Sequence, residues 1–305
     1  MDERKAGIIN IRKDKGFTSH DVVAKLRVLL HMKKIGHTGT LDPMAEGVLP
    51  VCLGTATKLC ESFSDGKKEY VATLRLGEVY DTLDITGVML EKREVMSTKE
   101  ELIEAIKSFE GGYDQVPPMY SAKKIEGKKL YEIARSGKTV DRKPVFVDIY
   151  EIEVLDVSLP EATIRVSCGR GTYIRSLIYD IGEKLGCGAV MLSLVRTKVG
   201  DFDIKNSYSL AEVAAAVADN NVEKVIIDVE QLYSGLKSVK TDENLSRLVH
   251  NGNYLNASDF ACMNLTADSF KDKERVRVYD SDGHFIAVYE YKKSRVILKP
   301  YKMFW

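Results

Sequence analysis

One carboxylate of the chain is set apart by its neighbours. Asp42 lies in the segment 36–58, GHTGTLDPMAEGVLPVCLGTATK, among glycines and directly before Pro43. Glycine permits backbone angles that other residues resist, and a residue that precedes proline is driven toward extended geometry. We therefore expect a stiff, non-helical loop that holds the Asp42 carboxylate outward. Glu46, the other acid of the segment, lacks this setting, although an isolated Asp-Pro pair is most often an ordinary turn.

A carboxylate held in this way can act as a nucleophile or can stabilise a developing positive charge. Arg175 is a second charged residue of interest, because an arginine in the first turn of a helix is disfavoured by the helix dipole and calls for a partner. From the residues alone, an ordinary surface ion pair stays equally open for Arg175. Tyr70 lies in an alternating strand pattern, so from the residues alone it is expected to be a strand aromatic that packs in the core.

Other kinds of chemistry find no support in the sequence. It contains no Walker A motif, no GxGxxG and no cluster of metal-ligand residues, so we expect neither a cofactor nor a metal. The five cysteines are scattered, which favours reduced thiols and a cytoplasmic protein. The charged N-terminal residues lack the apolar core of a signal peptide, and no apolar run approaches the roughly 18 residues that span a bilayer.

Composition sets the frame for these residues. At 305 residues with 44% hydrophobic side chains, the chain suits one large domain with a sizeable core and a second, small one. Lys plus Arg and Asp plus Glu each number 45, so the net charge is zero. A protein coated in positive charge is thereby excluded, whereas a local basic face is not.

The elements that must position the candidate residues follow from pattern and caps. We expect strands at 7–11, 48–53, 70–77, 145–157 and 162–168, the last two paired. We expect helices opened by Thr18 with Asp21, by Thr98 with Glu101, by Thr172 and by Ser209 with Glu212. After about Leu232, short strands flank the hairpin turn Asp282-Gly283.

The segment 115–138, QVPPMYSAKKIEGKKLYEIARSGK, opens a basic stretch. From Ser121 to Lys143 the chain carries eight Lys or Arg against three acids. A solvated helix face explains such a stretch as readily as contact with RNA does. Because the surplus is local in a neutral chain, RNA phosphate becomes a specific hypothesis for this segment.

Three stretches together resemble the TruB family of pseudouridine synthases. The segment 36–58 resembles its catalytic motif, 115–138 resembles its QxPPxYSAxKxxGxxLYExARxG signature, and GTYIR (171–175) resembles its arginine motif. The resemblance covers roughly residues 7–230 and, more weakly, the rest. It implies an α+β fold with a mixed, largely antiparallel sheet flanked by helices. It also implies a catalytic domain over 1–231 and a small PUA-like, RNA-binding β-barrel over 232–305.

The resemblance also implies roles for individual residues. Asp42 corresponds to the catalytic aspartate, Arg175 to the arginine that pairs with it, and Tyr70 to the tyrosine that stacks on the target base and is implicated in proton transfer. The remaining candidates for substrate binding are His37, which would fill the space of the flipped base, Leu194 as an apolar wall, Tyr173 in the arginine motif, and Lys13, Lys58 and Arg170 as phosphate contacts.

The activity implied is isomerisation of uridine to pseudouridine in RNA without a cofactor or metal. Standalone bacterial members of the family act on the T-loop uridine of tRNA, position 55, and we expect a monomer that binds the T-stem-loop and no membrane. Three alternatives stay open: a guide-RNA-dependent synthase, an RNA-binding or RNA-chaperone module whose chemistry has lapsed, and a hydrolase that releases uracil.

Overall fold

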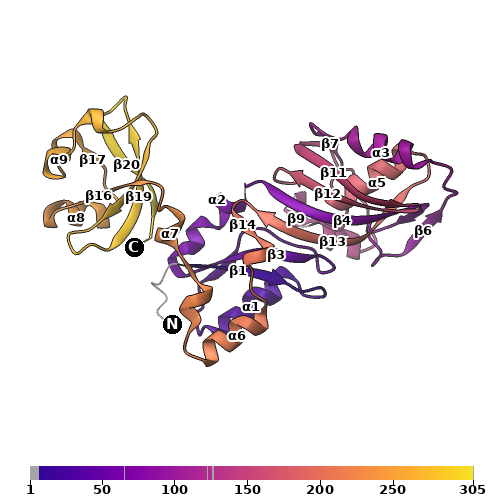
Figure 1. Cartoon of the computed structure of the whole chain (residues 1–305), viewed down its shortest axis with the longest axis horizontal. Coiled ribbons are helices and arrows are strands. Elements are labelled where there is room, and N and C mark those ends of the chain that lie inside the picture. Colours follow the sequence, from indigo (N-terminus) through magenta and orange to yellow (C-terminus); the bar gives the residue numbers. More distant parts are fainter. Residues whose placement is uncertain (1–6, 65, 122, 126, 305) are drawn as a thin grey trace.

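The computed structural model describes residues 7–64, 66–121, 123–125 and 127–304. The expectation for the charged N-terminal residues falls on 1–6, and Ala122 and Glu126 belong to the basic stretch; these lie outside the described residues. The molecule is elongated, with a large sheet toward one end and a smaller, curled sheet at the other (Figure 1).

The large sheet carries the candidate site. Its nine strands run in the order β11-β12-β4-β13-β3-β1-β15, with β14 paired to β13 and β2 to β3. Every described pair in it is antiparallel except β13 with β3. The predicted mixed, largely antiparallel sheet is therefore confirmed. The strands are β1 Gly7–Lys13, β2 Ile35–His37, β3 Glu46–Leu53, β4 Lys68–Leu76, β11 Ile149–Ser158, β12 Glu161–Cys168, β13 Ala189–Val199, β14 Phe202–Asp203 and β15 Ile227–Asp228.

Helices pack on this sheet in two groups. Helices α1 (Ser19–Leu29) and α6 (Leu210–Ala218) contact each other, and α6 lies against β1, whereas α3 (Lys99–Lys107) and α5 (Ile174–Lys184) pack at the other end of the sheet, beside β11 and β13 (Figure 1). Short helical segments are η1 Gly54–Leu59, α2 Cys60–Ser64, η2 Ile204–Asn206 and η3 Val222–Val225. The predicted capping boxes at Thr18, Thr98 and Ser209 are all confirmed.

The predicted cap of α5 is wrong. Thr172 Oγ1 donates to the carbonyl of Gly169 at 3.2 Å instead of capping, and the N-cap residue is Tyr173. The Tyr173 N–H donates to Gln115 Oε1 at 2.8 Å, and Gln115 Nε2 donates back to the Tyr173 carbonyl at 3.0 Å. A side chain from a distant strand therefore replaces the local cap that the sequence pattern favoured.

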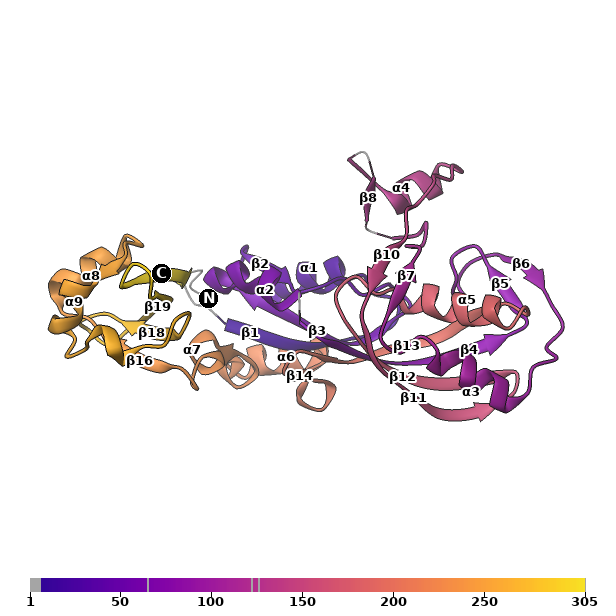
Figure 2. The same cartoon turned by 90° about the horizontal axis from the view of Figure 1, so that it is seen from above.

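Two extensions leave the large sheet. One is the hairpin of β5 (Glu78–Tyr80) and β6 (Met89–Lys92). The other starts from the ribbon of β7 (Tyr113–Gln115) and β10 (Val145–Val147) and projects from the body as an arm with β8 (Lys124–Ile125), β9 (Lys128–Lys129) and α4 (Leu130–Arg135), as Figure 2 shows. The arm is the basic stretch of the sequence.

The C-terminal part has a sheet and a core of its own. Its strands run in the order β16-β18-β19-β20-β17 around a core that includes Val276, Tyr289 and Leu298. Among the described strands β16 and β17 do not pair, so the sheet is curled but open, where the sequence favoured a barrel. The elements are α7 Val229–Leu232, β16 Lys237–Lys240, α8 Glu243–His250, β17 Leu255–Asn256, α9 Ala257–Cys262, η4 Ala267–Ser269, β18 Arg275–Tyr279, β19 Phe285–Lys292 and β20 Ile297–Met303.

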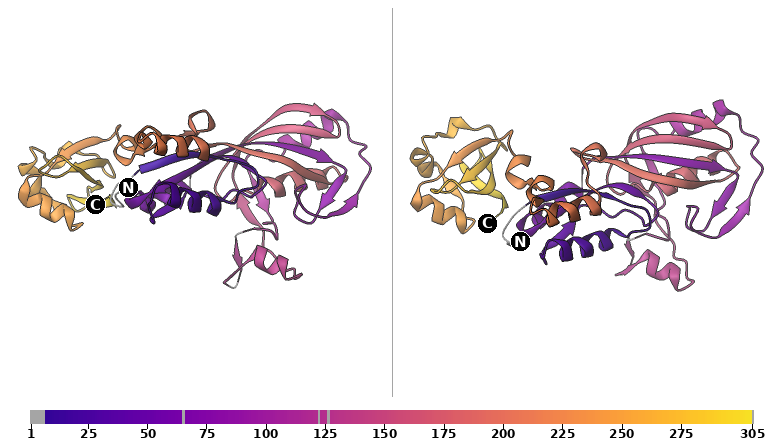
Figure 3. Two further views of the ribbon diagram at one scale, coloured as in Figure 1. Left: turned by 90° about the horizontal axis from the view of Figure 1, so that it is seen from below. Right: turned by 60° about the horizontal axis from the view of Figure 1, so that its bottom comes forward.

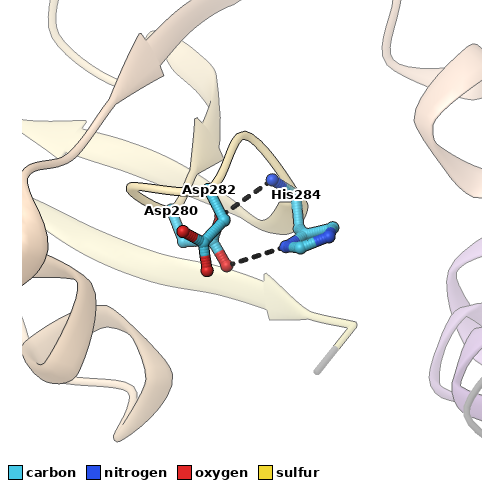
Figure 4. A group of neighbouring side chains, drawn as sticks. All are labelled: Asp280, Asp282 and His284. Carbon is cyan, nitrogen blue, oxygen red and sulfur yellow. Dashed lines mark hydrogen bonds and ion pairs between the residues drawn. The ribbon is translucent and has the colours of Figure 1, made fainter.

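The predicted turn Asp282-Gly283 lies between β18 and β19. Asp280 Oδ1 accepts from the His284 N–H at 2.8 Å, and Asp280 Oδ2 lies 3.3 Å from His284 Nδ1 (Figure 4). A second histidine, His250 of α8, lies with Nε2 3.5 Å from the same oxygen. These contacts account for the buried carboxylate of Asp280 and hold the hairpin against α8.

The C-terminal part is packed onto the body. Val288 and Phe304 share a buried cluster with Ile8 and Val48 of the large sheet, and Thr55 Oγ1 donates to the Phe304 carbonyl at 2.9 Å. Figure 3 shows the two parts meeting along this side. In the described part of the chain, no helix is long and apolar enough to cross a membrane.

Gly47 lets β3 and β13 approach where the site is built. Its φ is +103°, and a Cβ there would stand 2.2 Å from the carbonyl oxygen of Arg196. We predict that Gly47→Ala destabilises the protein by at least about 2 kcal/mol, because a left-handed alanine costs about 1–2 kcal/mol and overpacking about 1–3 kcal/mol more.

Urea unfolding of Gly47→Ala beside Gly186→Ala measures the difference. Gly186 has φ +74° and nothing within 4 Å of an added Cβ, so it should show the conformational cost alone. Equal losses for the two variants would contradict the close approach of the strands.

Candidate active site

A pocket of about 660 Å³ opens where the loop before β3 faces β4, β13 and the start of α5. Its size is in the range of sites that bind small molecules or single nucleotides. The residues that line it include Asp42, Lys68, Tyr70, Gln115, Arg170, Tyr173, Arg175, Leu194 and Arg196. The structure thus brings Asp42, Tyr70 and Arg175 together from positions far apart in the sequence.

The Asp42 loop is fixed from below. The buried hydroxyl of Ser19 accepts from the Leu41 N–H at 2.9 Å and lies 3.3 Å from the Leu41 carbonyl. The Pro43 carbonyl accepts from the Gly16 N–H at 2.8 Å, and Lys13 Nζ lies 3.4 Å from the same oxygen. Because both neighbours of Asp42 are held, the backbone that carries the carboxylate is rigid, as the sequence predicted.

Arg175 is surrounded by acceptors. Its Nε lies 2.9 Å from Asp42 Oδ2, and its Nη1 lies 3.4 Å from Asp84 Oδ2. Nη1 also donates to the Thr82 carbonyl and Nη2 to the Tyr120 carbonyl, each at 2.9 Å. The Arg175 side chain is 4% exposed, so the surface ion pair that the sequence left open does not describe it.

Asp84 is a site residue that sequence reasoning missed. It lies in the DTLDITG turn, is buried, and accepts from the Thr82 hydroxyl and from the Thr86 N–H and hydroxyl. Leu83, between Thr82 and Asp84, adopts φ +63°, an unusual backbone conformation for a bulky residue. A polar turn with two threonines around one acid was visible in the sequence, but nothing in it indicated that Arg175 would lie there.

The charge state of Asp42 reflects two opposed effects. Burial raises the pKa of the Asp42 carboxyl, and the Arg175 guanidinium beside it is the largest influence that lowers this pKa. A third of the Asp42 side chain, 35%, is nevertheless exposed in the pocket. Arg175 therefore favours the ionised carboxylate while leaving one face of it accessible.

Tyr70 lies opposite this ion pair, on β4. It is 7% exposed and lines the pocket. Burial raises the pKa of its hydroxyl, and the guanidinium of Arg196 opposes that rise. Leu194 and Arg196 are two apart on β13 and so share the face that lines the pocket.

Of the six other predicted site residues, three line the pocket and three do not. Tyr173, Arg170 and Leu194 line the pocket. Gln115, which sequence reasoning also missed as a site residue, fixes the backbone of Tyr173.

Two lysines predicted as phosphate contacts are placed elsewhere. Lys13 is fully buried, and its ammonium donates to the carbonyls of Asp14 and Phe17; burial lowers its pKa to about 8. Lys58 is exposed on η1, where its carbonyl accepts from Lys302 of the C-terminal part. Neither is among the pocket-lining residues, so the structure gives Lys13 a supporting position under the loop instead.

His37 also stands outside the pocket lining, at the end of β2. Its Nδ1 accepts from the Gly39 N–H at 3.3 Å, and its ring meets that of His20 edge-on at 5.4 Å. Burial lowers the pKa of His37 to about 4, with His20 and Arg196 acting in the same direction. The imidazole is thus neutral at physiological pH and helps to shape the loop.

Comparison with known proteins covers nearly the whole chain. Residues 27–174 match the TruB family pseudouridylate synthase (N terminal domain), and residues 175–234 match the tRNA pseudouridylate synthase B C-terminal domain. The tRNA pseudouridine synthase B of Lachnoclostridium phytofermentans is 47% identical over 98% of this chain and 99% of its own length. The tRNA pseudouridine synthase B of Thermotoga petrophila is 41% identical over 97% of this chain and 93% of its own length.

Solved structures agree. A Cbf5-Nop10-Gar1 complex contains a chain with a TM-score of 0.71 and 27% identity, covering 99% of this chain and 86% of that one. A chain of an H/ACA RNP bound to a substrate RNA containing 2'-deoxyuridine has a TM-score of 0.68 and 26% identity. The match covers 98% of this chain and 85% of that one. The chain therefore belongs to the TruB family of pseudouridine synthases, which makes it an isomerase.

Proposed function

We propose that this protein, acting alone, isomerises the T-loop uridine at position 55 of tRNA to pseudouridine. The observation that carries the proposal is the partly exposed Asp42 carboxylate, held by buried Arg175 and facing Tyr70 across one pocket. The curated relatives that match over almost their full length are tRNA pseudouridine synthases, which supports tRNA as the substrate.

The reaction changes bonds but not composition. The bond from C1′ of the ribose to N1 of uracil breaks, the base turns, and C1′ bonds to C5. The proton on C5 leaves, and N1 gains one, so the product is an isomer of the substrate. Asp42 can attack the sugar or stabilise its positive charge while the base is detached.

A base within folded RNA does not reach Asp42 unless the nucleotide is flipped out of the stack. Flipping costs a few kcal/mol, and stacking on an aromatic ring returns about 1–3 kcal/mol. Tyr70 supplies the ring and Leu194 an apolar wall of the pocket. Tyr173 and Arg170 line the same pocket, which supports a role for them in holding the adjoining sugar and phosphate. Neutral His37 contacts the loop before Asp42, which supports a role in shaping the space for the flipped base.

Three further features complete the proposal. The basic arm with α4 suits the RNA backbone near the pocket, and the curled C-terminal sheet supplies a second contact with tRNA. The similarity to a tRNA pseudouridine synthase B is higher, at 47%, than to chains of an H/ACA RNP and of a Cbf5-Nop10-Gar1 complex, at 26–27%; we therefore favour a monomer that needs no guide. The five free thiols suit a cytoplasmic location.

The decisive assay uses a purified T-stem-loop RNA. Conversion of one uridine without a change of mass, located by carbodiimide-dependent stops of primer extension, supports the proposal. Release of free uracil would instead indicate a hydrolase, and tight binding without conversion a lapsed enzyme.

We predict that Asp42→Asn abolishes isomerisation and leaves RNA affinity within about threefold, because the amide keeps the shape but removes the charge. Single-turnover conversion and filter binding measure the two properties. Glu46→Gln, which alters the exposed acid of the same loop, is the matched control and should remain near wild type. Turnover of Asp42→Asn at a few per cent of the wild-type rate would refute an essential role for the carboxylate.

We predict that Arg175→Met slows the reaction by about 100-fold or more, since removing one fixed electrostatic partner at a reacting centre typically costs about 10²–10³-fold in rate. Arg175 lowers the pKa of Asp42, so its loss raises that pKa and moves the acid limb of the rate profile to higher pH. Activity should therefore recover partly as pH rises. Arg175→Lys should also be slow, because lysine lacks the planar fork that reaches both carboxylates.

Single-turnover rates from about pH 5 to about pH 9 test the shift, since this interval covers carboxyl groups with raised pKa values. Arg93→Met is the control, because Arg93 pairs with Glu183 of the same helix α5 at 2.7 Å in an exposed position, where such pairs contribute about 0–1 kcal/mol. An Arg175→Lys enzyme at wild-type speed, together with an unmoved acid limb for Arg175→Met, would remove Arg175 from the active site.

We predict that Lys293→Ala with Lys299→Ala, two exposed lysines of the C-terminal sheet, weakens tRNA binding without changing which uridine is modified. Each lost phosphate contact should lower the log–log salt slope by roughly 0.7–0.9. Lys205→Ala with Lys224→Ala, exposed on the body, is the control. Unaltered affinity and slope in the first variant would argue against RNA contact by those lysines.

A further inference from the structure

A second arginine of the pocket, Arg196, is buried without an acid. It is 1% exposed and has the largest side chain among the fully buried residues that the structure describes. Within the described ranges of the chain, no carboxylate forms an ion pair with Arg196, whereas Arg175 meets two. Burying an uncompensated charge is expensive. A guanidinium in this position therefore calls for a reason other than stability.

The contacts of Arg196 reach both ends of the Asp42 loop. Its Nε donates to the carbonyl of Val48 at 2.7 Å, and its Nη2 donates to the carbonyl of Gly39 at 3.1 Å. Val48 lies in β3 after the loop, and Gly39 lies before Asp42. One guanidinium thus closes the loop across its base.

The same guanidinium faces Tyr70. Arg196 is the residue opposite Tyr70 in the antiparallel pair of β13 with β4, and both side chains line the pocket. Its backbone also lies against Gly47 of β3. The charge is therefore held in place by three strands and cannot swing away from the phenol.

We propose that Arg196 is a positioning residue of the isomerisation, which ties the Asp42 loop to β3 and holds a positive charge beside the hydroxyl of Tyr70, so that Tyr70 can take the proton that leaves C5. The inference rests on the proposed function and adds to it a role for Arg196. At 1% exposure the guanidinium offers almost no surface to a substrate, so we assign its effect to its two neighbours, the Asp42 loop and Tyr70.

The proton step is balanced by the substrate itself. Tyr70, as the phenolate, accepts the proton from C5 after the bond from C1′ to C5 has formed, and the phenol then returns a proton to N1 of the product, which restores the phenolate. The phenolate must exist for this step. Because burial raises the pKa of Tyr70 and Arg196 lowers it, loss of Arg196 raises the pKa and shifts the rise of the rate with pH to more alkaline values.

Single-turnover rates of Arg196→Met across pH test the proposal. We expect a loss of at least tenfold near neutral pH, partial recovery at alkaline pH, and RNA affinity within about threefold of wild type. Arg75→Met is the matched control, an arginine of β4 that pairs with Glu161 at the surface, and should match wild type. A merely structural role for Arg196 would lower the rate at every pH without moving the profile.

A double-mutant cycle with Tyr70→Phe gives an independent readout. If Arg196 acts through the hydroxyl, Tyr70→Phe should cost much less in the Arg196→Met enzyme than in wild type. Additive losses together with an unmoved profile would overturn the proposal.

Arg196→Lys separates the effect of the charge from an effect on folding. Thermal melts of each variant, measured beside the rates, show whether it is folded. Lysine keeps the charge beside Tyr70 but loses the two-carbonyl contact, so the rate should fall while the profile stays near that of wild type. If the pH–rate profile of Arg196→Lys were displaced as far as that of Arg196→Met, the result would contradict the role of the charge. A wild-type enzyme that converts no uridine would instead refute the proposed function, and the role of Arg196 with it.

Discussion

The structure of the site depends on one buried guanidinium. Arg175 lies between Asp42 and Asp84, and two backbone carbonyls accept hydrogen bonds from its Nη1 and Nη2. Removing Arg175 would leave two carboxylates without the cation that they share. The loop before β3, the turn after β5 and the start of α5 are therefore mutually dependent, although more than ninety residues separate Arg175 from Asp84 along the chain.

The sheet explains how such distant pieces meet. Strands β4 and β13 lie side by side at its centre, and their register places Arg196 opposite Tyr70. The parallel pairing of β13 with β3 brings the end of the Asp42 loop to the same place, and Gly47 permits the close approach. Tertiary packing thus fixes the distance between the carboxylate and the phenol, the two groups that the proposed chemistry needs.

The charges of the pocket are arranged asymmetrically. Around Arg175 two carboxylates outnumber one cation, whereas the cations Arg196 and Lys68 line the pocket on the strands that carry Tyr70 and its neighbour. Such a division separates an acidic wall, which suits positive charge on a sugar, from a basic wall, which suits a phenolate. A chain of zero net charge therefore holds a strongly polarised site.

The sequence by itself indicated most of the elements and singled out the candidate aspartate. Periodicity and capping boxes located most strands and helices, and the Gly- and Pro-rich setting singled out Asp42, because these signals act over a few neighbouring residues. The predicted cap of α5 was wrong because the N-cap residue is held by Gln115, which belongs to a distant strand, and not by a local side chain. Lys13 was expected at a phosphate, yet the fold buries it under the loop. Asp84 and Arg196 became site residues only in the folded chain, since a polar turn and a strand arginine have no local mark of their partners. Burial and long-range pairing are properties of the packed sheet, and only the tertiary structure decided them.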